Sequence, residues 1–188
     1  MNSAMIGFLL ATGVIFSGLL GAIAYYLWRR AQSSKRDWEQ LMGRLILVDQ
    51  KGIDRVALDT IEPSGRRRTD ELARELTADQ IWQMLGGLDG VEILEKNSHV
   101  LVEMAMHLQR WYPEAAVAAE DLRLQAKELQ WHVERLRMAA DKGHLEFHFA
   151  SYAQNATVDY YLMTQRLVAF AETKPLPPYA KVGRILNP

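Results

Sequence analysis

The sequence contains no cysteine among its 188 residues. This absence excludes a cysteine nucleophile and agrees with a reducing compartment such as the cytoplasm. Proline is also rare, and four of the six prolines lie in the last 15 residues. The formal net charge is only −1, so the chain as a whole has no excess of positive charge that would attract nucleic acid.

Charged side chains are missing from the 26 residues between Ser3 and Trp28. A helix needs about 20 apolar residues to cross the hydrocarbon core of a bilayer, so residues 1–30 are predicted to form a transmembrane anchor. A secretory signal peptide is the competing interpretation, because small residues around Gly21 could allow cleavage. A signal peptide, however, has basic residues before its apolar stretch, and here the basic cluster follows it.

The residues that end this apolar segment predict its orientation. Basic residues next to a span remain in the cytoplasm, so the N-terminus is expected outside and the bulk of the chain in the cytoplasm. Amphipathic aromatic rings favour the boundary between hydrocarbon and water. The predicted membrane-interface residues are Tyr25, Tyr26, Trp28, Arg29, Arg30, Lys35 and Arg36.

Small residues recur along one side of the apolar segment. Gly13, Ser17 and Gly21 are four residues apart, with Gly18 and Ala22 in a second row beside them. Such rows let the backbones of two transmembrane helices approach closely, so they predict a docking face for another helix. Glycine and alanine are also simply common in spans, and the pattern does not separate self-association from association with a different protein.

After the anchor, about 160 residues remain, which suits one domain with its own core. In residues 31–68, the spacing of Trp38, Leu41, Leu45 and Val48 predicts an amphipathic helix ending near Gly52, with a strand over residues 45–48 as the alternative. A loop with a basic run follows. The run consists of Arg66, Arg67 and Arg68, which are either solvated or in contact with anionic lipid or an acidic partner.

Residues 69–172 have the periodicity of an antiparallel helical bundle. Thr77 and Gln80 form a capping-box pattern for a short helix that ends at Gly86 and Gly87. Two longer stripes then alternate steps of three and four residues, and a third lies on one face of a last helix, with breaks near Pro113 and Gly143. The stripes are Val91, Leu94, Ser98, Leu101, Ala105, Leu108 and Tyr112; Ala115, Ala119, Leu122, Ala126, Leu129, Val133, Leu136 and Ala140; and Tyr152, Ala156, Tyr160, Met163, Leu167 and Phe170.

The middle helix carries a second apolar stripe opposite its alanine-rich one. Leu124, Trp131 and Met138 are seven residues apart, so they share one face. Either another segment of the same domain covers this face, or the face contacts another protein, a role in which aromatic and methionine side chains are common. Trp111, at a helix junction, is a second candidate for a partner contact.

Histidine and glutamate recur four residues apart, as in Glu95 with His99, Glu103 with His107 and Glu128 with His132. Dinuclear iron sites of helical bundles use a spacing of three residues, and the heptad places the first two pairs on the flank and outer surface of their helix. We therefore expect no metal, no cofactor and no enzymatic activity, and no serine lies in a nucleophile elbow.

The last segment, residues 173–188, is rich in proline and is expected to be an extended tail. Its predicted partner contacts are Pro175, Pro177, Pro178 and Tyr179.

The predicted architecture is thus all-α, with one N-terminal transmembrane helix, a cytoplasmic antiparallel bundle and an extended tail. It predicts a non-catalytic accessory subunit that docks in and stabilises a larger membrane complex, by analogy of architecture with subunits of photosynthetic or respiratory assemblies. The expected partners are other membrane protein subunits and anionic lipid, with self-association also allowed and nucleic acid not expected. The alternatives are a membrane-tethered regulatory protein and, less favoured, a metal-containing enzyme in the bundle.

Overall fold

The computed structural model describes residue 13 and residues 16–25, 38–62, 68, 75–109 and 112–173. The chain divides into two compact units, residues 1–36 and residues 37–188. Each secondary-structure element assigned in the second unit's described residues is an α-helix. The prediction of an all-α fold is confirmed.

In the first unit, residues 16–25 are helical, and all of their side chains are exposed. These ten residues include Phe16, Leu19, Leu20 and Ile23, which are between 47% and 61% exposed. Among the described helices, none combines the length and the apolar character required to span a bilayer. Much of the predicted anchor, including Tyr26, Trp28 and the basic cluster after it, lies outside the described residues.

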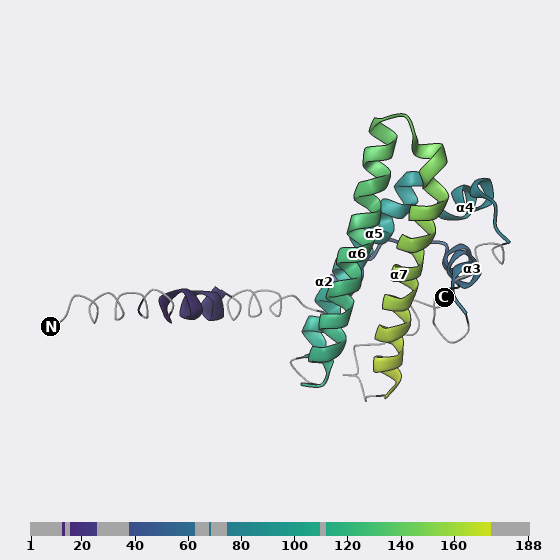
Figure 1. The fold of residues 1–188 in the computed structure, drawn as a ribbon. Coiled ribbons are helices and arrows are strands. Elements are labelled where there is room, and N and C mark those ends of the chain that lie inside the picture. The colour runs from purple at the N-terminus through teal and green to yellow at the C-terminus, as the bar shows by residue number, and fades with distance from the viewer. Residues whose placement is uncertain are drawn as a thin grey trace, which may run out of the picture. The chain divides into compact units, whose positions relative to one another are not determined.

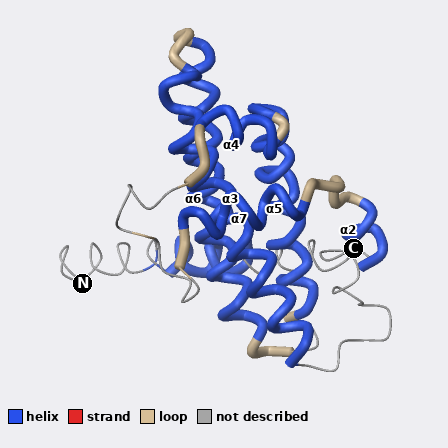
Figure 2. Tube along the Cα trace, turned by 90° about the vertical axis from the view of Figure 1, so that its right-hand side faces the viewer, coloured by secondary structure: helices blue, strands red, loops and turns tan. Residues whose placement is uncertain are grey.

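Three long helices form the body of the second unit (Figures 1 and 2). Helix α5 spans Gly87–Leu108, helix α6 spans Ala115–Asp141 and helix α7 spans Leu145–Thr173. Short connections before Ala115 and before Leu145 reverse the chain direction, and all three helices contact one another. The predicted helical bundle is therefore present.

The core lies where the three predicted stripes meet. Leu101, Leu122, Leu129 and Met163 are completely buried. Alanines at 119 and 126 are also buried, and their small side chains allow α6 to pack closely against its neighbours. Burial of one large aliphatic side chain stabilises the fold by roughly 1.5–3 kcal/mol, so these seams supply much of the stability of the bundle.

The segment before the bundle differs from the predicted single helix. Helix α2 spans only Trp38–Gly43, residues 45–49 are non-helical, and a separate helix α3 spans Gln50–Thr60. The expected continuation of one helix to Gly52 was wrong. Helix α2 packs on α5, whereas α3 packs on α7 and on helix α4, which spans Ala78–Leu85.

The helix ends follow the predicted chemistry. Thr77 and Gln80 form a complete capping box at the start of α4, and Gly86 ends that helix with a φ of 76°. Gly143 has a φ of 70° in the turn after α6, a value that side chains with a Cβ rarely adopt. Both turns therefore depend on glycine.

Candidate functional site

The outward face of α6 carries a row of exposed apolar side chains. Val117, Leu124, Trp131 and Met138 are spaced by seven residues and are 71%, 49%, 46% and 43% exposed. We call these four residues the α6 stripe. The described helices leave these side chains 43–71% exposed, so cover by another segment of the same domain, one of the two alternatives for Leu124, Trp131 and Met138, is not seen among the described residues.

The neighbours of α6 contact its two sides and leave this face open. Towards α5, Arg137 donates from Nε to Glu92 at 2.9 Å and from Nη2 to Glu95 at 2.8 Å. Towards α7, Asp121 pairs with Arg166 at 3.7 Å. The stripe lies between these two contact lines, on the third side of the helix.

Trp131 is held in place by its surroundings. The guanidinium of Arg135 lies 4.9 Å from the centre of the indole ring, an arrangement worth about 0.5–1 kcal/mol at an exposed site. Tyr152 of α7 packs edge-on against the same ring at 5.8 Å between centroids. A side chain that is already ordered loses little entropy on binding, which makes Trp131 a suitable anchor for a partner.

Beneath Trp131, the α6–α7 interface contains a buried histidine and carboxylate. His132 Nε2 lies 3.7 Å from Asp159 Oδ2, and their side chains are only 11% and 2% exposed. The sequence pattern paired His132 with Glu128, whereas the fold brings it to Asp159. The available signal was a charged residue within the buried register of α7, between Ala156 and Tyr160.

Two residues of α5 are more buried than predicted. Glu95 and His107 were expected on the flank and outer surface, but they are 8% and 7% exposed. Glu95 is buried because Arg137 covers its carboxylate, and His107 packs against the ring of Trp38 at 5.9 Å. Hydrogen bonding to Glu92, followed by that to Glu95, raises the pKa of Arg137 against an opposing effect of burial.

A second polar link ties the segment after α2 to the bundle. The amide of Asn97 accepts from Ile46 N at 2.9 Å and donates to Ile46 O at 2.8 Å. The same amide nitrogen donates to the hydroxyl of Tyr160 at 3.4 Å, and burial raises the pKa of that hydroxyl. The guanidinium of Arg44 donates two hydrogen bonds to the carboxylate of Glu103, at 2.7 and 2.9 Å.

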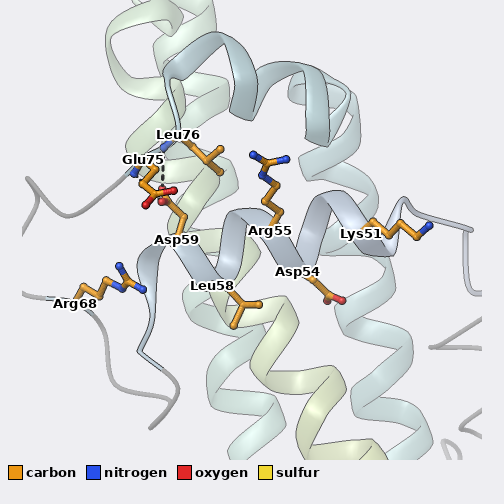
Figure 3. A pocket seen from close by; sticks show the side chains of 8 residues that line it. All are labelled: Lys51, Asp54, Arg55, Leu58, Asp59, Arg68, Glu75 and Leu76. Carbon is orange, nitrogen blue, oxygen red and sulfur yellow. Dashed lines mark hydrogen bonds between the residues drawn. The ribbon is translucent and has the colours of Figure 1, made fainter.

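A shallow pocket of about 490 Å³ lies beside α3 (Figure 3). Its wall is formed by Lys51, Asp54, Arg55, Leu58, Asp59, Arg68, Glu75 and Leu76. Asp59 accepts from the backbone of Glu75 at 2.8 Å and of Leu76 at 3.4 Å, so it serves to attach the chain before α4. Three cations and three carboxylates share the wall, so the pocket does not select for either sign of charge.

Metal ligands do not cluster in the part of the chain that the structure describes, where no group of three or more histidine and acidic side chains could hold an ion. His99 is exposed on α5. His144 lies in the turn before α7 and His148 in its first turn.

The remaining predicted site residues fall into two groups. Gly13, Ser17, Gly18, Gly21, Ala22 and Tyr25 are exposed, and a Cβ added at any of the three glycines would meet no atom within 4 Å. Arg68 is half-buried and its backbone N–H donates to Thr60 O at 2.8 Å. Outside the described residues lie Tyr26, Trp28, Arg29, Arg30, Lys35, Arg36, Arg66, Arg67, Trp111, Pro175, Pro177, Pro178 and Tyr179.

Comparison of the chain with protein-family models, with curated proteins and with solved structures finds no match. The functional conclusion therefore depends on the residues and their geometry.

Proposed function

We propose that this protein is a non-catalytic, single-span accessory subunit that docks in a larger membrane protein complex and stabilises it. One observation carries the proposal. The α6 stripe presents four apolar side chains, each between 43% and 71% exposed, on a helix whose opposite face is already fully packed. A row of large apolar residues that does not serve the core is typical of a surface that binds another protein.

The first unit supports the membrane part of the proposal. Its helical residues 16–25 contain no charged side chain, and every one of them is exposed. The uncharged sequence continues from Ser3 to Trp28, and the basic residues that follow favour a cytoplasmic location for the bundle. In this arrangement the small-residue rows of the anchor contact a transmembrane helix of the complex, and the cationic residues contact anionic lipid.

The polar groups of the bundle support a structural role. Arg137, Asn97 and Asp59 each bond two points of the chain that are far apart in sequence. These groups hold the helices and connections together and do not converge on a common cleft, as a catalytic site requires. In the complex, the proline-rich tail lies along a neighbouring subunit.

The test is isolation of the tagged full-length chain from its native membranes. Membranes are first washed with alkaline carbonate, then solubilised in a mild detergent, and the companions of the chain are identified and quantified. The proposal expects the chain to stay in the washed membrane and to be recovered with stoichiometric membrane proteins. Release by carbonate, or recovery without any other protein, would contradict it.

The same experiment separates the proposal from its main alternative. A regulatory tether would be recovered with a soluble partner in less than stoichiometric amount, and its tail would be cleaved by protease until that partner is added. Stoichiometric membrane companions that persist through a second purification step support the accessory subunit.

A further inference from the structure

The charges beside the α6 stripe form an ordered pattern. Residues four positions after each stripe residue lie about 40° around the helix from it. On this side, which faces α7, the residues are two acidic side chains followed by two basic ones. They are Asp121, Glu128, Arg135 and Lys142.

This order is complementary to itself when reversed. If a second α6 helix lies antiparallel, with the two Trp131 residues at the two-fold axis, Glu128 faces Arg135 of the second copy. In the same register Asp121 faces Lys142 of the second copy, and Leu124 packs against Met138 of the second copy. In a parallel two-fold pair the two flanks exchange, so Glu128 would lie near Lys127 of the second copy and the charges would pair there as well; the helix dipoles favour the antiparallel arrangement, in which opposite helix ends lie side by side.

The other flank of the stripe is only partly complementary to itself. It contains Glu120, Lys127, Glu134 and Asp141, each three positions after a stripe residue. In the antiparallel register Lys127 faces Glu134 of the second copy, whereas Glu120 faces Asp141 of the second copy. Three kinds of attractive pair then oppose one repulsive pair.

We propose that the α6 stripe binds the α6 stripe of a second copy of this chain, antiparallel and two-fold symmetric about Trp131. This inference rests on the proposed function, because it assigns an occupant to the docking surface named there. An isologous two-fold contact is the commonest arrangement among homo-oligomers. In this register it covers Leu124, Trp131 and Met138 of each copy, whereas Val117 lies opposite position 145, beyond the end of α6.

The local contacts of the flanking residues agree with this register. Glu128 and Arg135 are both exposed. Arg135 rests on the face of Trp131, so its guanidinium is already positioned beside the proposed axis. Asp121 pairs with Arg166 at 3.7 Å, but that pair is about half exposed, so Asp121 remains accessible to the second copy.

The absence of cysteine makes the geometry directly testable by cross-linking. Two full-length chains with different tags are co-expressed in membranes, one with Leu124→Cys and the other with Met138→Cys. Residues 124 and 138 are 14 positions apart, so in a parallel pair they are separated by roughly 21 Å. A disulfide requires Cα atoms within about 7 Å, so only the antiparallel register links the two different tags.

We expect mild oxidation to join Leu124→Cys to Met138→Cys and to leave two Leu124→Cys chains unlinked. Linkage between two Leu124→Cys chains would show a parallel pair and overturn the inference. If no pair of cysteines forms a disulfide, including two Trp131→Cys chains, the inference is also overturned. The stripe would then bind a different protein.

Charge reversal provides an independent test of the register. Co-isolation of two differently tagged chains is expected to fall roughly tenfold for Glu128→Arg, since two attractive pairs become repulsive in each dimer. The double variant Glu128→Arg with Arg135→Glu is expected to restore co-isolation, because the exchanged charges again face each other. Lys96→Glu, on the exposed side of α5, is the matched control and should change nothing. If co-isolation of the double variant is as low as that of the single variant, the inference is overturned.

Failure of this inference and failure of the proposed function are distinguishable in these preparations. If the two tags do not associate but other membrane proteins are recovered in stoichiometric amount, only the self-association is wrong. If the tags associate and no other protein is recovered, the pair stands and the larger complex is wrong.

Discussion

The two faces of helix α6 have the same periodicity but opposite environments. Its inward face carries small and aliphatic residues, of which Leu122, Leu129 and Val133 are completely buried. Its outward face carries Trp131 and Met138, which are larger and stay almost half exposed. The comparison shows that heptad spacing predicts a contact surface but does not tell whether the contact is intramolecular. The outward face is the one that the described helices leave about half exposed.

The largest expected effect comes from truncating the same residue type on each face. Leu129→Ala should lower the free energy of unfolding by about 2–5 kcal/mol, because it leaves a cavity in a packed seam. Leu124→Ala should change it by less than about 1 kcal/mol, because the side chain is half exposed. Denaturant unfolding of the full chain in detergent, followed by circular dichroism, measures both. Equal losses would remove the distinction between the faces.

A smaller effect is expected from the polar link on the inner side of the bundle. Asn97→Ala removes both hydrogen bonds to the backbone of Ile46 and leaves these groups without their partner. The loss should be about 1–3 kcal/mol, measured by the same unfolding experiment. Lys96→Ala on the exposed side of α5 is the control, with a change below about 0.5 kcal/mol. A neutral Asn97→Ala variant would show that the segment after α2 does not depend on this link.

The smallest expected effect depends on pH. Burial raises the pKa of Tyr160 in the folded chain above that in the unfolded chain, so the folded state keeps its proton to higher pH. The resulting stability is present below the unfolded value of about 10 and is lost as the pH rises towards the folded value. Unfolding at pH 9 and pH 11 should reveal the loss, and Tyr160→Phe should make it smaller. If the free energy of unfolding depends on pH in the same way in the wild type and in Tyr160→Phe, this assignment is contradicted.

Periodicity was sufficient to predict the bundle because the contacts among α5, α6 and α7 use successive turns of each helix. The glycines Gly86 and Gly143 also indicated the end of α4 and the turn after α6, because the backbone has a positive φ at both positions. These features depend on residues close together in sequence. Their physical causes are therefore readable from the chain itself.

Features that depend on distant residues were missed. Residues 45–49 leave the helix, and Ile46 bonds instead to Asn97, 51 positions away. Glu95 is buried because Arg137 reaches it from α6, and His132 meets Asp159 because of the rotation of α7 about its axis. The sequence also named Leu124, Trp131 and Met138 without deciding their exposure, because that depends on where the neighbouring helices stop covering α6.

The most direct test of the account replaces one residue of the stripe by a charge. Leu124→Glu and the wild-type chain are expressed at equal levels, isolated from membranes in mild detergent, and compared for stoichiometric companions and for their free energy of unfolding. The account predicts that the variant unfolds like the wild type, within about 1 kcal/mol, but loses the second copy that occupies the stripe. Full retention of the second copy and of every other companion by a variant that still folds would contradict the central claim that this face of α6 is a binding surface.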